Sequence, residues 1–538
     1  MKKKVTLTFP TLVIIAFTLV ALTRLGNVHA VQTVVQLKWA NPMPVYDMAV
    51  SGDANHLVAA NNTGLYYFDA DNRDPVWWYE PPTSFFRSVA ISSDGGYVVA
   101  GDNDGFLSYF NQSTQRVENQ TMSTWTSYDM GGPIERGTMD ISANGNCTVV
   151  GGTGLNVWYY AGCTNRNGTN NFATWTSGPV GVMDFMTVHI SADGRYVAGG
   201  GTRFDSSGFT VFYENADNTT GYCSPAWMSY GQTPARIVDL ALSEDGYAVA
   251  AIDSNFASLY YWANATGLEG NPNATWTNPG FFSCLDMSGD GSKVVTGGYY
   301  LTSLHFWDNC RTRNGVQAED WVKLETVNVY DVAMNKEGNM IAAPAMGLPS
   351  NYTAYFLTQN GTILEGYPLP QFANMVSMSA DGTTTAMAGP GYDSLYLFKV
   401  EEDSTPPSIN EVWQQPNNTS VQPYDNVNVF ANITDDQSGV QQVTLNYTTG
   451  NGTWFTRPMD LYQRDIWNGT IPAFPYNTTI TYVIIAEDNA NNTITTHELG
   501  YTLQYTVIPE NAAILAALII MTATLALVAI RKKRNSKP

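Results

Sequence analysis

The sequence predicts an all-β protein whose main part is an eight-bladed β-propeller. Three observations support this fold class: a short segment recurs eight times, most copies contain an aromatic strand followed by a tryptophan strand, and the last copy lacks a strand that the chain supplies before the first. The composition agrees, because the 538 residues are 12% aromatic and only 14% charged. Such a chain is long enough for two or three domains and is typical of a β-rich protein with a large core.

Each copy has an apolar strand that ends in a small polar turn. The turns begin at Ser51, Ser92, Ser142, Ser191, Ser243, Ser288, Asn335 and Ser379. Their spacing of 41 to 52 residues is within or near the range of propeller blades. Five turns read Ser-x-Asp-Gly, in which glycine accepts positive φ and the polar side chains bond nearby backbone. This pattern predicts a β-hairpin.

The four strands of a copy are named A to D in chain order. Strand A precedes the turn, B follows it ("YVVAG"), C is aromatic ("LSYF") and D centres on tryptophan ("TWTSY"). Four short strands bury both faces only when stacked radially as blades. The eighth copy ends at "LYLFKV" without a D strand, whereas "VVQLKWANP" at 34–42 precedes the first copy. We therefore predict that this N-terminal strand completes the last blade and closes the ring over residues 31–402.

These repeats resemble the WD-repeat and quinoprotein-like propellers of prokaryotic surface proteins, archaeal ones in particular. The resemblance covers about two-thirds of the chain and departs from the eukaryotic WD pattern. A regular Gly-His pair is absent, and Trp-Asp closes a C strand only at Trp307–Asp308. The resemblance implies either a binding module or an enzyme that holds a quinone and calcium over the ring axis. The adjacent cysteines of the quinone enzymes are absent, and blade packing also explains the repeated tryptophans.

Residues 403–508 differ in composition, since they are rich in Thr, Asn and Val and lack cysteine. Alternating strands such as "DQSGVQQVTLNY" resemble those of immunoglobulin-like or fibronectin-like sandwiches. We expect this domain to be a stalk between propeller and membrane. Asp435, Asp436, Glu487 and Asp488 are candidate calcium ligands at one end of the sandwich, and turn capping by these carboxylates is the alternative. Apart from this calcium possibility, no cofactor is expected.

The two ends of the chain predict export and anchoring. Residues 1–30 combine Lys2–Lys4, an apolar run and "VHA" before a cleavage point, which is typical of a secretory signal, with an uncleaved anchor as the alternative. Residues 512–530 carry no charge, and the basic tail 531–538 follows. This order predicts one transmembrane helix with both domains outside the cell and the C-terminus in the cytoplasm.

Charge and glycosylation motifs agree with a surface protein. Between the basic ends, 17 Lys and Arg face 47 Asp and Glu, a net charge of about −30 that argues against nucleic acid as a partner. Eighteen Asn-x-Ser/Thr motifs predict N-glycosylation, with some chance matches among them. They lie at Asn61, Asn111, Asn119, Asn146, Asn167, Asn218, Asn264, Asn273, Asn351, Asn360, Asn417, Asn418, Asn432, Asn446, Asn451, Asn468, Asn477 and Asn491.

The cysteines give no support to a zinc site or a redox pair, because no Cys-x-x-Cys spacing occurs among the five. An odd number leaves at least one thiol free or paired with another chain. Cys147 and Cys284 lie in strand patterns, which favours buried, inert thiols.

One set of polar residues recurs at a fixed place in the repeats, four residues before the turn. In three copies this residue is an aspartate, Asp47, Asp239 or Asp331. The register places these residues at the start of the innermost strands, around one mouth of the channel. Two hypotheses follow: the carboxylates form a cation-attracting funnel, or they bond the backbone of neighbouring blades.

The loops predict which face binds a partner. Seven of the glycosylation motifs lie in C-to-D loops, so we expect the C-to-D face to look toward the membrane. The opposite loops are unusually apolar and make Phe85, Phe86, Tyr299 and Tyr300 candidate binding residues.

Together these features favour a membrane-anchored, N-glycosylated surface protein whose propeller binds or scaffolds an extracellular protein or glycan. No nucleophile, acid–base pair or cofactor motif is identified, so we expect no enzyme. A quinone-dependent dehydrogenase on the same propeller and a structural component of the cell envelope remain the alternatives.

Overall fold

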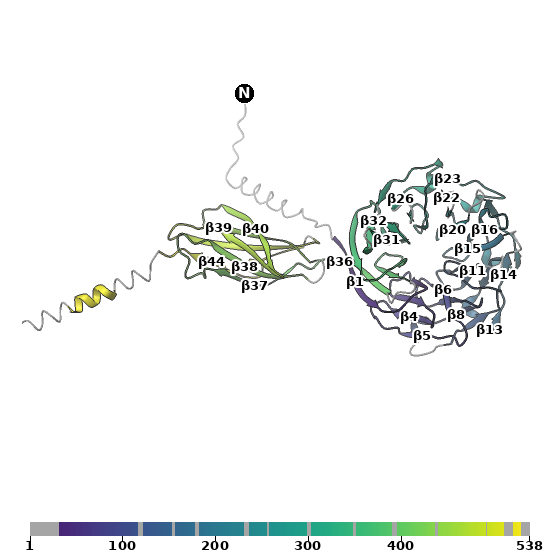
Figure 1. The fold of residues 1–538 in the computed structure, drawn as a ribbon, viewed down its shortest axis with the longest axis horizontal. Coiled ribbons are helices and arrows are strands. Elements are labelled where there is room, and N and C mark those ends of the chain that lie inside the picture. The colour runs from purple at the N-terminus through teal and green to yellow at the C-terminus, as the bar shows by residue number, and fades with distance from the viewer. Residues whose placement is uncertain are drawn as a thin grey trace, which may run out of the picture. The chain divides into compact units, whose positions relative to one another are not determined.

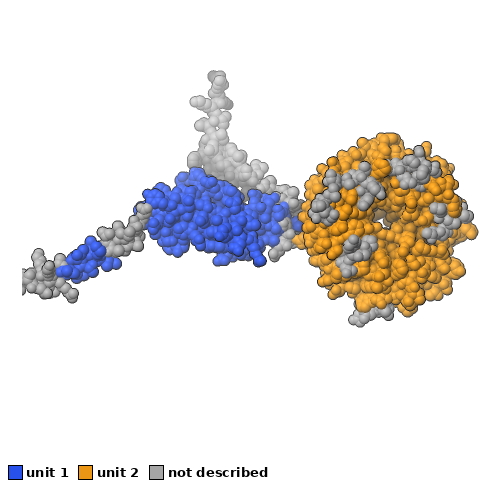
Figure 2. Space-filling model, in the orientation of Figure 1, with its two compact units in different colours: residues 1–34, 402–538 blue, residues 35–401 orange. Residues whose placement is uncertain are grey.

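The chain forms two compact units, which a computed structural model describes separately (Figure 2). The propeller unit is Val35–Glu401, and the second unit combines residues 1–34 with residues 402–538. The structure describes residues 32–116, 122–152, 156–177, 182–230, 236–254, 258–298, 303–325, 327–347, 351–389, 395–435, 439–490, 492–509 and 520–528.

The propeller unit consists of eight antiparallel sheets around a central axis (Figure 1). The strands of the first four blades, in the order A to D, are β2 Asp47–Val50, β3 His56–Ala60, β4 Leu65–Asp69 and β5 Trp77–Tyr79; β6 Phe86–Ile91, β7 Val98–Asp102, β8 Leu107–Phe110 and β9 Trp125–Ser127; β10 Met139–Ile141, β11 Cys147–Val150, β12 Trp158–Ala161 and β14 Trp175–Ser177; and β15 Val182–Ile190, β16 Val197–Arg203, β17 Gly208–Tyr213 and β19 Trp227–Tyr230. The eight-bladed, all-β architecture predicted from the repeats is thereby confirmed.

The last four blades follow the same order, with strand A of the seventh divided in two. Their strands are β20 Ile237–Leu242, β21 Ala248–Asp253, β22 Ser258–Ala263 and β23 Trp276–Pro279; β24 Cys284–Met287, β25 Val294–Gly298, β26 Ser303–Trp307 and β28 Trp321–Lys323; β29 Asn328–Val329 with β30 Ala333–Met334, β31 Met340–Gly347, β32 Asn351–Thr358 and β33 Ile363–Leu369; and β34 Met375–Met378, β35 Thr384–Ala388, β36 Leu395–Asp403 and β1 Gln32–Asn41. The N-terminal β1 is the outer strand of the eighth blade, beside β36.

The D-strand tryptophans link seven of the eight blades to the next one, and strand D of the seventh blade contains no tryptophan. The indole N–H donates to a backbone carbonyl just after strand C of the following blade, over 2.8–3.0 Å. The pairs are Trp39 to Ala70, Trp77 to Ser113, Trp125 to Cys163, Trp175 to Ala216, Trp227 to Ala265, Trp276 to Cys310 and Trp321 to Gln359. Trp39 of β1 makes the same bond as the others, which identifies β1 as a D strand.

The aromatic residues of strand C explain why these tryptophans are held so firmly. Within each of the first six blades, a strand C ring stacks on the strand D indole with ring centroids 5.0–5.5 Å apart. The stacked pairs are Tyr67–Trp77, Tyr109–Trp125, Tyr159–Trp175, Phe212–Trp227, Tyr261–Trp276 and Phe306–Trp321. The repeated tryptophans are therefore accounted for by packing between blades.

A ring of backbone hydrogen bonds surrounds the end of the channel where the A-to-B turns lie. Each turn donates an N–H to a carbonyl of the neighbouring turn over 2.8–3.2 Å. The ring runs Asp53 to Ser93, Ser93 to Ala143, Ala143 to Ala192, Ala192 to Glu244, Glu244 to Gly289, Gly289 to Lys336, Lys336 to Ala380, and Ala380 to Gly52. Within a turn the serine hydroxyl donates to the aspartate, as in Ser92 to Asp94 (2.6 Å), and Gly95 adopts φ +69°. These are the hairpins that the Ser-x-Asp-Gly pattern predicts.

Three C-to-D loops add a fifth strand to the preceding blade. These strands are β13 Gly168–Asn171 beside β9, β18 Gly221–Cys223 beside β14, and β27 Gly315–Val316 beside β23, all parallel to their partners. Five short 3-10 helices open these and other C-to-D loops at η1 Ser113–Gln115, η2 Cys163–Asn165, η3 Ala216–Asn218, η4 Ala265–Gly267 and η5 Cys310–Thr312. The sequence analysis did not predict this overlap between blades.

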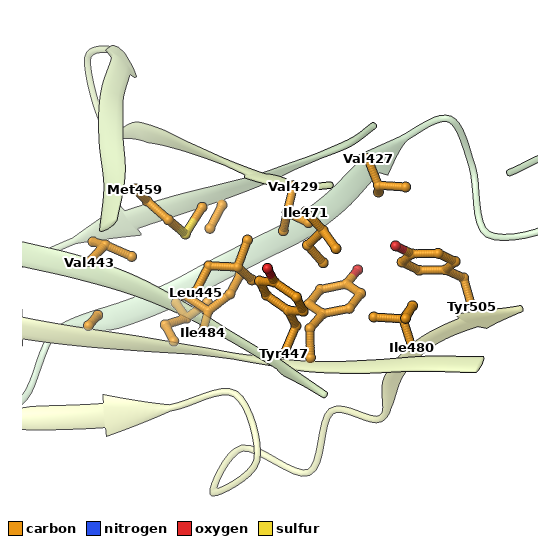
Figure 3. Close-up of a cluster of buried hydrophobic side chains, with 14 of the residues drawn as sticks. Val427, Val429, Val443, Leu445, Tyr447, Met459, Ile471, Ile480, Ile484 and Tyr505 are labelled. Atoms are coloured by element: carbon orange, nitrogen blue, oxygen red, sulfur yellow. The ribbon is translucent and has the colours of Figure 1, made fainter. Parts of the chain in front are cut away.

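The second unit is all-β with its own core. Its strands are β37 Ser408–Gln415, β38 Val427–Thr434, β39 Val440–Thr448, β40 Trp454–Gln463, β41 Ile466–Ile471, β42 Thr479–Asp488, β43 Thr493–Thr495 and β44 Leu503–Thr506. β40 pairs with β39 through its first half and with β41 through its second. Alternate residues of β38 and β42 are buried in a cluster that includes Val429, Leu445 and Ile484 (Figure 3). The immunoglobulin-type assignment of this unit remains a prediction.

The predicted membrane span is described only in part. Residues 520–528 are helical (Figure 1), and among the residues that the structure describes no helix has the length and apolar character needed to cross a bilayer. The rest of 512–530, the basic tail 531–538 and the signal segment 1–30 lie outside the described residues.

Candidate functional site

A cavity of about 450 Å³ opens at the end of the channel where the A strands begin. Figure 2 shows an opening at the centre of the ring. The lining residues come from seven of the eight blades and include Asp47, Asp239, Asp331, Arg136, His189 and Tyr330. The structure thus brings together the three aspartates that the repeat register placed at one mouth.

The polar residues of the channel form two layers. Asp47, Asp239 and Asp331 make up the outer layer. Asp140 and Asp286 make up the inner layer, two residues further along the equivalent strands. Two residues along a strand correspond to about 7 Å, and side chains two apart face the same side. Five carboxylates therefore surround the axis within a short length of channel.

All five carboxylates also connect adjacent blades. One oxygen of each accepts from the following backbone N–H of its own strand, as Asp47 does from Met48 (3.0 Å). The other oxygen accepts from an N–H of the next blade in five pairs: Asp47 with Val89 (2.9 Å), Asp140 with Ile190 (3.0 Å), Asp239 with Leu285 (2.9 Å), Asp286 with Met334 (2.7 Å) and Asp331 with Val376 (3.1 Å). This geometry supports the hypothesis that the carboxylates bond neighbouring backbone, and it leaves each with further acceptor capacity.

A single guanidinium spans the mouth. Arg136, from the loop before β10, places Nη2 2.6 Å from Asp331 Oδ2 and Nε 3.4 Å from Asp47 Oδ1. These carboxylates belong to the seventh and first blades, so the side chain reaches across the ring. The ion pairs of the described residues give Asp239 no such cationic partner. The mouth therefore already accommodates one guanidinium and keeps excess negative charge beside it.

The sequence analysis missed Arg136, although the repeat register contains the pattern that identifies it. The residue two positions before the outer-layer site is apolar and at most 5% exposed in the seven other blades: Val45, Phe86, Phe185, Ile237, Phe282, Val329 and Ala373. Arg136 is the exception in this column. The same column corrects one predicted binding residue, because Phe86 is 1% exposed and belongs to the core between the first two blades.

Burial changes the protonation of the channel carboxylates. It raises the pKa of Asp239 to about 6 and that of Asp286 to about 7, while hydrogen bonds from backbone N–H groups oppose the shift. Burial also raises the pKa of Asp47 despite the nearby Arg136 charge. Burial lowers the pKa of His189, but the hydrogen bond and charge of Asp140 raise it more, so its net shift is upward. As the pH falls from 8 to 5, the channel therefore loses negative charge at Asp239 and Asp286 and gains positive charge at His189.

This titration predicts a pH dependence of stability. The folded-state pKa values of Asp239 and Asp286 lie above the ordinary 3.8, so their contribution to stability is fully present below about pH 4 and is lost as the pH rises through 6 and 7. We expect the thermal midpoint of the propeller to be higher at pH 5 than at pH 8, and the double variant Asp239→Asn, Asp286→Asn to reduce the difference by roughly 2–4 °C. His189 acts in the same direction and His305, whose pKa burial lowers, acts in the opposite one, but both remain in the variant. An unchanged pH dependence in the double variant would contradict the assignment.

The remaining predicted binding residues stay untested. Phe85 is half-buried and packs against Tyr46 with ring centroids 6.0 Å apart, whereas Tyr299 and Tyr300 lie outside the described residues. The binding face that these residues mark therefore remains a prediction.

The glycosylation motifs differ in accessibility. Asn61 is 5% exposed, and its side-chain oxygen accepts hydrogen bonds from the Thr63 N–H and hydroxyl and from the Gly64 N–H, so we expect it to remain unmodified in the folded protein. Asn119 and Asn491 lie outside the described residues, and no side-chain description is given for Asn351. Exposed motifs are at Asn167, Asn218, Asn264, Asn273, Asn360, Asn417, Asn418, Asn451 and Asn477, and partly exposed ones at Asn111, Asn146, Asn432, Asn446 and Asn468.

The five cysteines are all free and buried. Burial raises the pKa of each thiol, most strongly for Cys163, Cys284 and Cys310. Thiols of this kind are poor nucleophiles and poor metal ligands, in agreement with the expectation for Cys147 and Cys284.

One group of side chains has the residue types of a nucleophilic site. Ser303 Oγ is 2.7 Å from His305 Nε2, and His305 Nδ1 is 3.7 Å from Glu319 Oε1. Ser303 is only 5% exposed, and His305 packs between Phe282 and Trp307. Because the hydroxyl is enclosed within the blade, this arrangement is suited to packing rather than to attack on a substrate.

The comparison with solved structures agrees with the fold. The chain is similar to the crystal structure of the C-terminal WD40 domain of Sif2, with a TM-score of 0.51 and 13% sequence identity over 69% of this chain and 99% of that chain. At this identity the likeness shows an eight-bladed WD40-type propeller fold and does not extend to partners or activity. No protein-family model matches the sequence, and no curated protein does either.

Proposed function

We propose that the protein is a membrane-anchored, N-glycosylated surface protein whose propeller is an extracellular binding module, and that the channel mouth receives a positively charged group of its partner. The fold supports the first part, since a closed propeller presents a rigid ring of loops around a channel. The uncharged segment 512–530 with its basic tail, the segment 1–30 and the exposed glycosylation motifs support export and anchoring. The second unit is suited to a stalk of immunoglobulin-like type.

The observation that carries the proposal is the excess of carboxylate at the mouth. Asp47 and Asp331 already hold the Arg136 guanidinium between them, which supports a site for a group of this kind. Asp239 lines the same cavity and has no ion-pair partner among the described residues. A volume of about 450 Å³ admits a second guanidinium or ammonium side chain. Since a partly desolvated carboxylate gains strongly from a charged hydrogen bond, an arginine or lysine of the partner is the complementary ligand.

A pair of neutral and charged probes tests this proposal. We expect N-acetyl-arginine amide to bind the purified full-length protein in isothermal titration, and the neutral isostere N-acetyl-citrulline amide to bind at least about tenfold more weakly, because it lacks the charge. Asp239→Asn should weaken arginine binding by a similar factor. A fluorescent form of the arginine probe should reach the site on intact cells, because the proposed site is extracellular.

The matched control lies at the opposite mouth. Glu244 lines that second cavity and pairs with Lys336 over 2.5 Å, so Glu244→Gln removes a channel carboxylate without touching the proposed site. We expect it to bind the arginine probe like the unmodified protein. Equal binding of arginine and citrulline probes, or equal losses in the two variants, would reject the charged mouth as the ligand site.

A further inference from the structure

Three aspartates meet at one end of the second unit. Asp403 ends β36, Asp435 follows β38 and Asp488 ends β42. One carboxylate oxygen from each lies within 4.8 Å of the other two. The sequence analysis expected Asp435 and Asp488 here, together with Asp436, which lies outside the described residues. Glu487 is not part of the group, since its Oε2 accepts from Gln442 Nε2.

Two of these carboxylates, Asp403 and Asp488, are buried without a cationic partner among the described residues. Asp403 is 1% exposed and Asp488 is fully buried. Asp403 Oδ1 accepts from the Thr405 N–H over 2.8 Å, whereas its Oδ2 is buried without a hydrogen-bond partner. The ion pairs of the described residues include neither Asp403 nor Asp488. A buried carboxylate oxygen with no partner is strongly unfavourable unless a cation occupies the adjacent space.

The surrounding structure holds the three side chains in position. Asp435 Oδ1 accepts from the Gly439 N–H over 2.6 Å. Asn492 donates its backbone N–H and its Nδ2 to the two oxygens of Asp488, over 2.8 and 3.0 Å. The same Nδ2 donates to the backbone carbonyl of Asp403 over 3.0 Å, so Asn492 connects two of the aspartates.

The donor set and spacing select the type of ion. All three side chains offer oxygen, and the group that the structure describes contains no His or Cys, which disfavours zinc and copper. Ca²⁺ binds oxygen at about 2.3–2.6 Å, so two of its ligands are separated by up to about 5 Å, in agreement with the observed spacing. Mg²⁺ requires a tighter octahedron and retains more water.

We propose that Asp403, Asp435 and Asp488 form a calcium site of the second unit, with backbone carbonyls or water completing the coordination. The ion neutralises the three carboxylates, of which Asp403 and Asp488 are buried, and supplies the missing partner of Asp403 Oδ2. Calcium binding then stabilises the folded second unit, because the unfolded chain does not assemble the three ligands.

Calcium titration of the full-length protein in detergent tests the site. After dialysis against EDTA and then chelator-free buffer, we expect CaCl₂ to bind in isothermal titration and to raise the thermal unfolding midpoint, with a smaller rise for MgCl₂. Asp403→Asn and Asp435→Asn should each weaken calcium binding at least about tenfold. Glu487→Gln, one residue from Asp488 but turned away from the group, should bind calcium like the unmodified protein.

A second measurement separates loss of the site from loss of the fold. Asp403→Asn removes an uncompensated buried charge, so in the absence of metal this variant should be at least as stable as the unmodified protein while its midpoint no longer responds to calcium. The absence of a calcium-dependent shift up to 5 mM CaCl₂ in the unmodified protein would overturn the proposal. Calcium binding that Asp403→Asn and Asp435→Asn leave unchanged would overturn it as well. Arginine binding at the channel mouth is measured separately, so the two proposals fail independently.

Discussion

Deletion of residues 34–42 is expected to convert the folded propeller into an aggregating or unfolded chain. The deletion removes most of β1 and leaves the backbone of β36 as an open edge. It also removes Val35 and Trp39, which are each 8% exposed and belong to two different core clusters. Loss of a buried tryptophan alone costs about 3–5 kcal/mol, a large part of the 5–15 kcal/mol that stabilises a typical domain.

Size-exclusion chromatography and thermal unfolding of the deletion variant test this expectation, and a peptide provides the control. A synthetic peptide of residues 32–42, added during refolding, should restore the monomer because β1 pairs only along β36. The same peptide with Trp39→Ala should fail, since it lacks the bond to Ala70. A monomeric deletion variant with an unchanged midpoint would show that β1 is dispensable for closure.

The part of the fold that depends on local pattern was predictable from the sequence. The Ser-x-Asp-Gly turns form hairpins because glycine and the turn side chains determine the backbone locally. The place of β1 was predictable for a related reason, since its tryptophan is one member of a repeated pattern. The fifth strands β13, β18 and β27 follow no such pattern, because each pairs with a strand of another blade through a long polar loop.

The candidate sites also combine features that the sequence pattern predicts with features that depend on packing between blades. Asp47, Asp239 and Asp331 were placed at one mouth by register alone, but their bonds to the next blade depend on packing between repeats. Arg136 stands at a position that is apolar in the other seven blades, so only a comparison of that position between blades identifies it.

For the calcium group, strand alternation already separates Glu487 from Asp488. Ile480, Tyr482, Ile484 and Ala486 are buried, so Asp488 continues the inner face of β42 and Glu487 lies on the outer face. Asp403 was beyond reach, because it approaches Asp488 from a strand 85 residues earlier. No local pattern encodes that contact.

The substitution Trp175→Ala is expected to destabilise the propeller by about 3–5 kcal/mol. Trp175 is 1% exposed, stacks on Tyr159 with centroids 5.1 Å apart, and packs against Tyr213 of the next blade at 5.2 Å. Its indole N–H donates to the Ala216 carbonyl over 2.8 Å, so the substitution leaves both a cavity and a buried acceptor without its donor. Urea unfolding of the full-length protein, followed by near-ultraviolet circular dichroism, measures the loss.

Two further variants separate the contributions to this loss. Trp175→Phe retains an aromatic ring but lacks the N–H donor, so it should cost less stability than Trp175→Ala. The difference between the two variants reports the ring contacts. The unpaired Ala216 carbonyl accounts for about 1–3 kcal/mol of the loss in Trp175→Phe. Trp454→Ala removes a tryptophan that is 50% exposed in the second unit and should change stability by less than about 0.5 kcal/mol.

In a closed ring each blade contacts two neighbours, so weakening the junction between the third and fourth blades should lower the stability of the whole propeller in one transition. A loss below about 1 kcal/mol for Trp175→Ala, or a separate early transition confined to one blade, would show that the tryptophan bonds are not what holds the ring together.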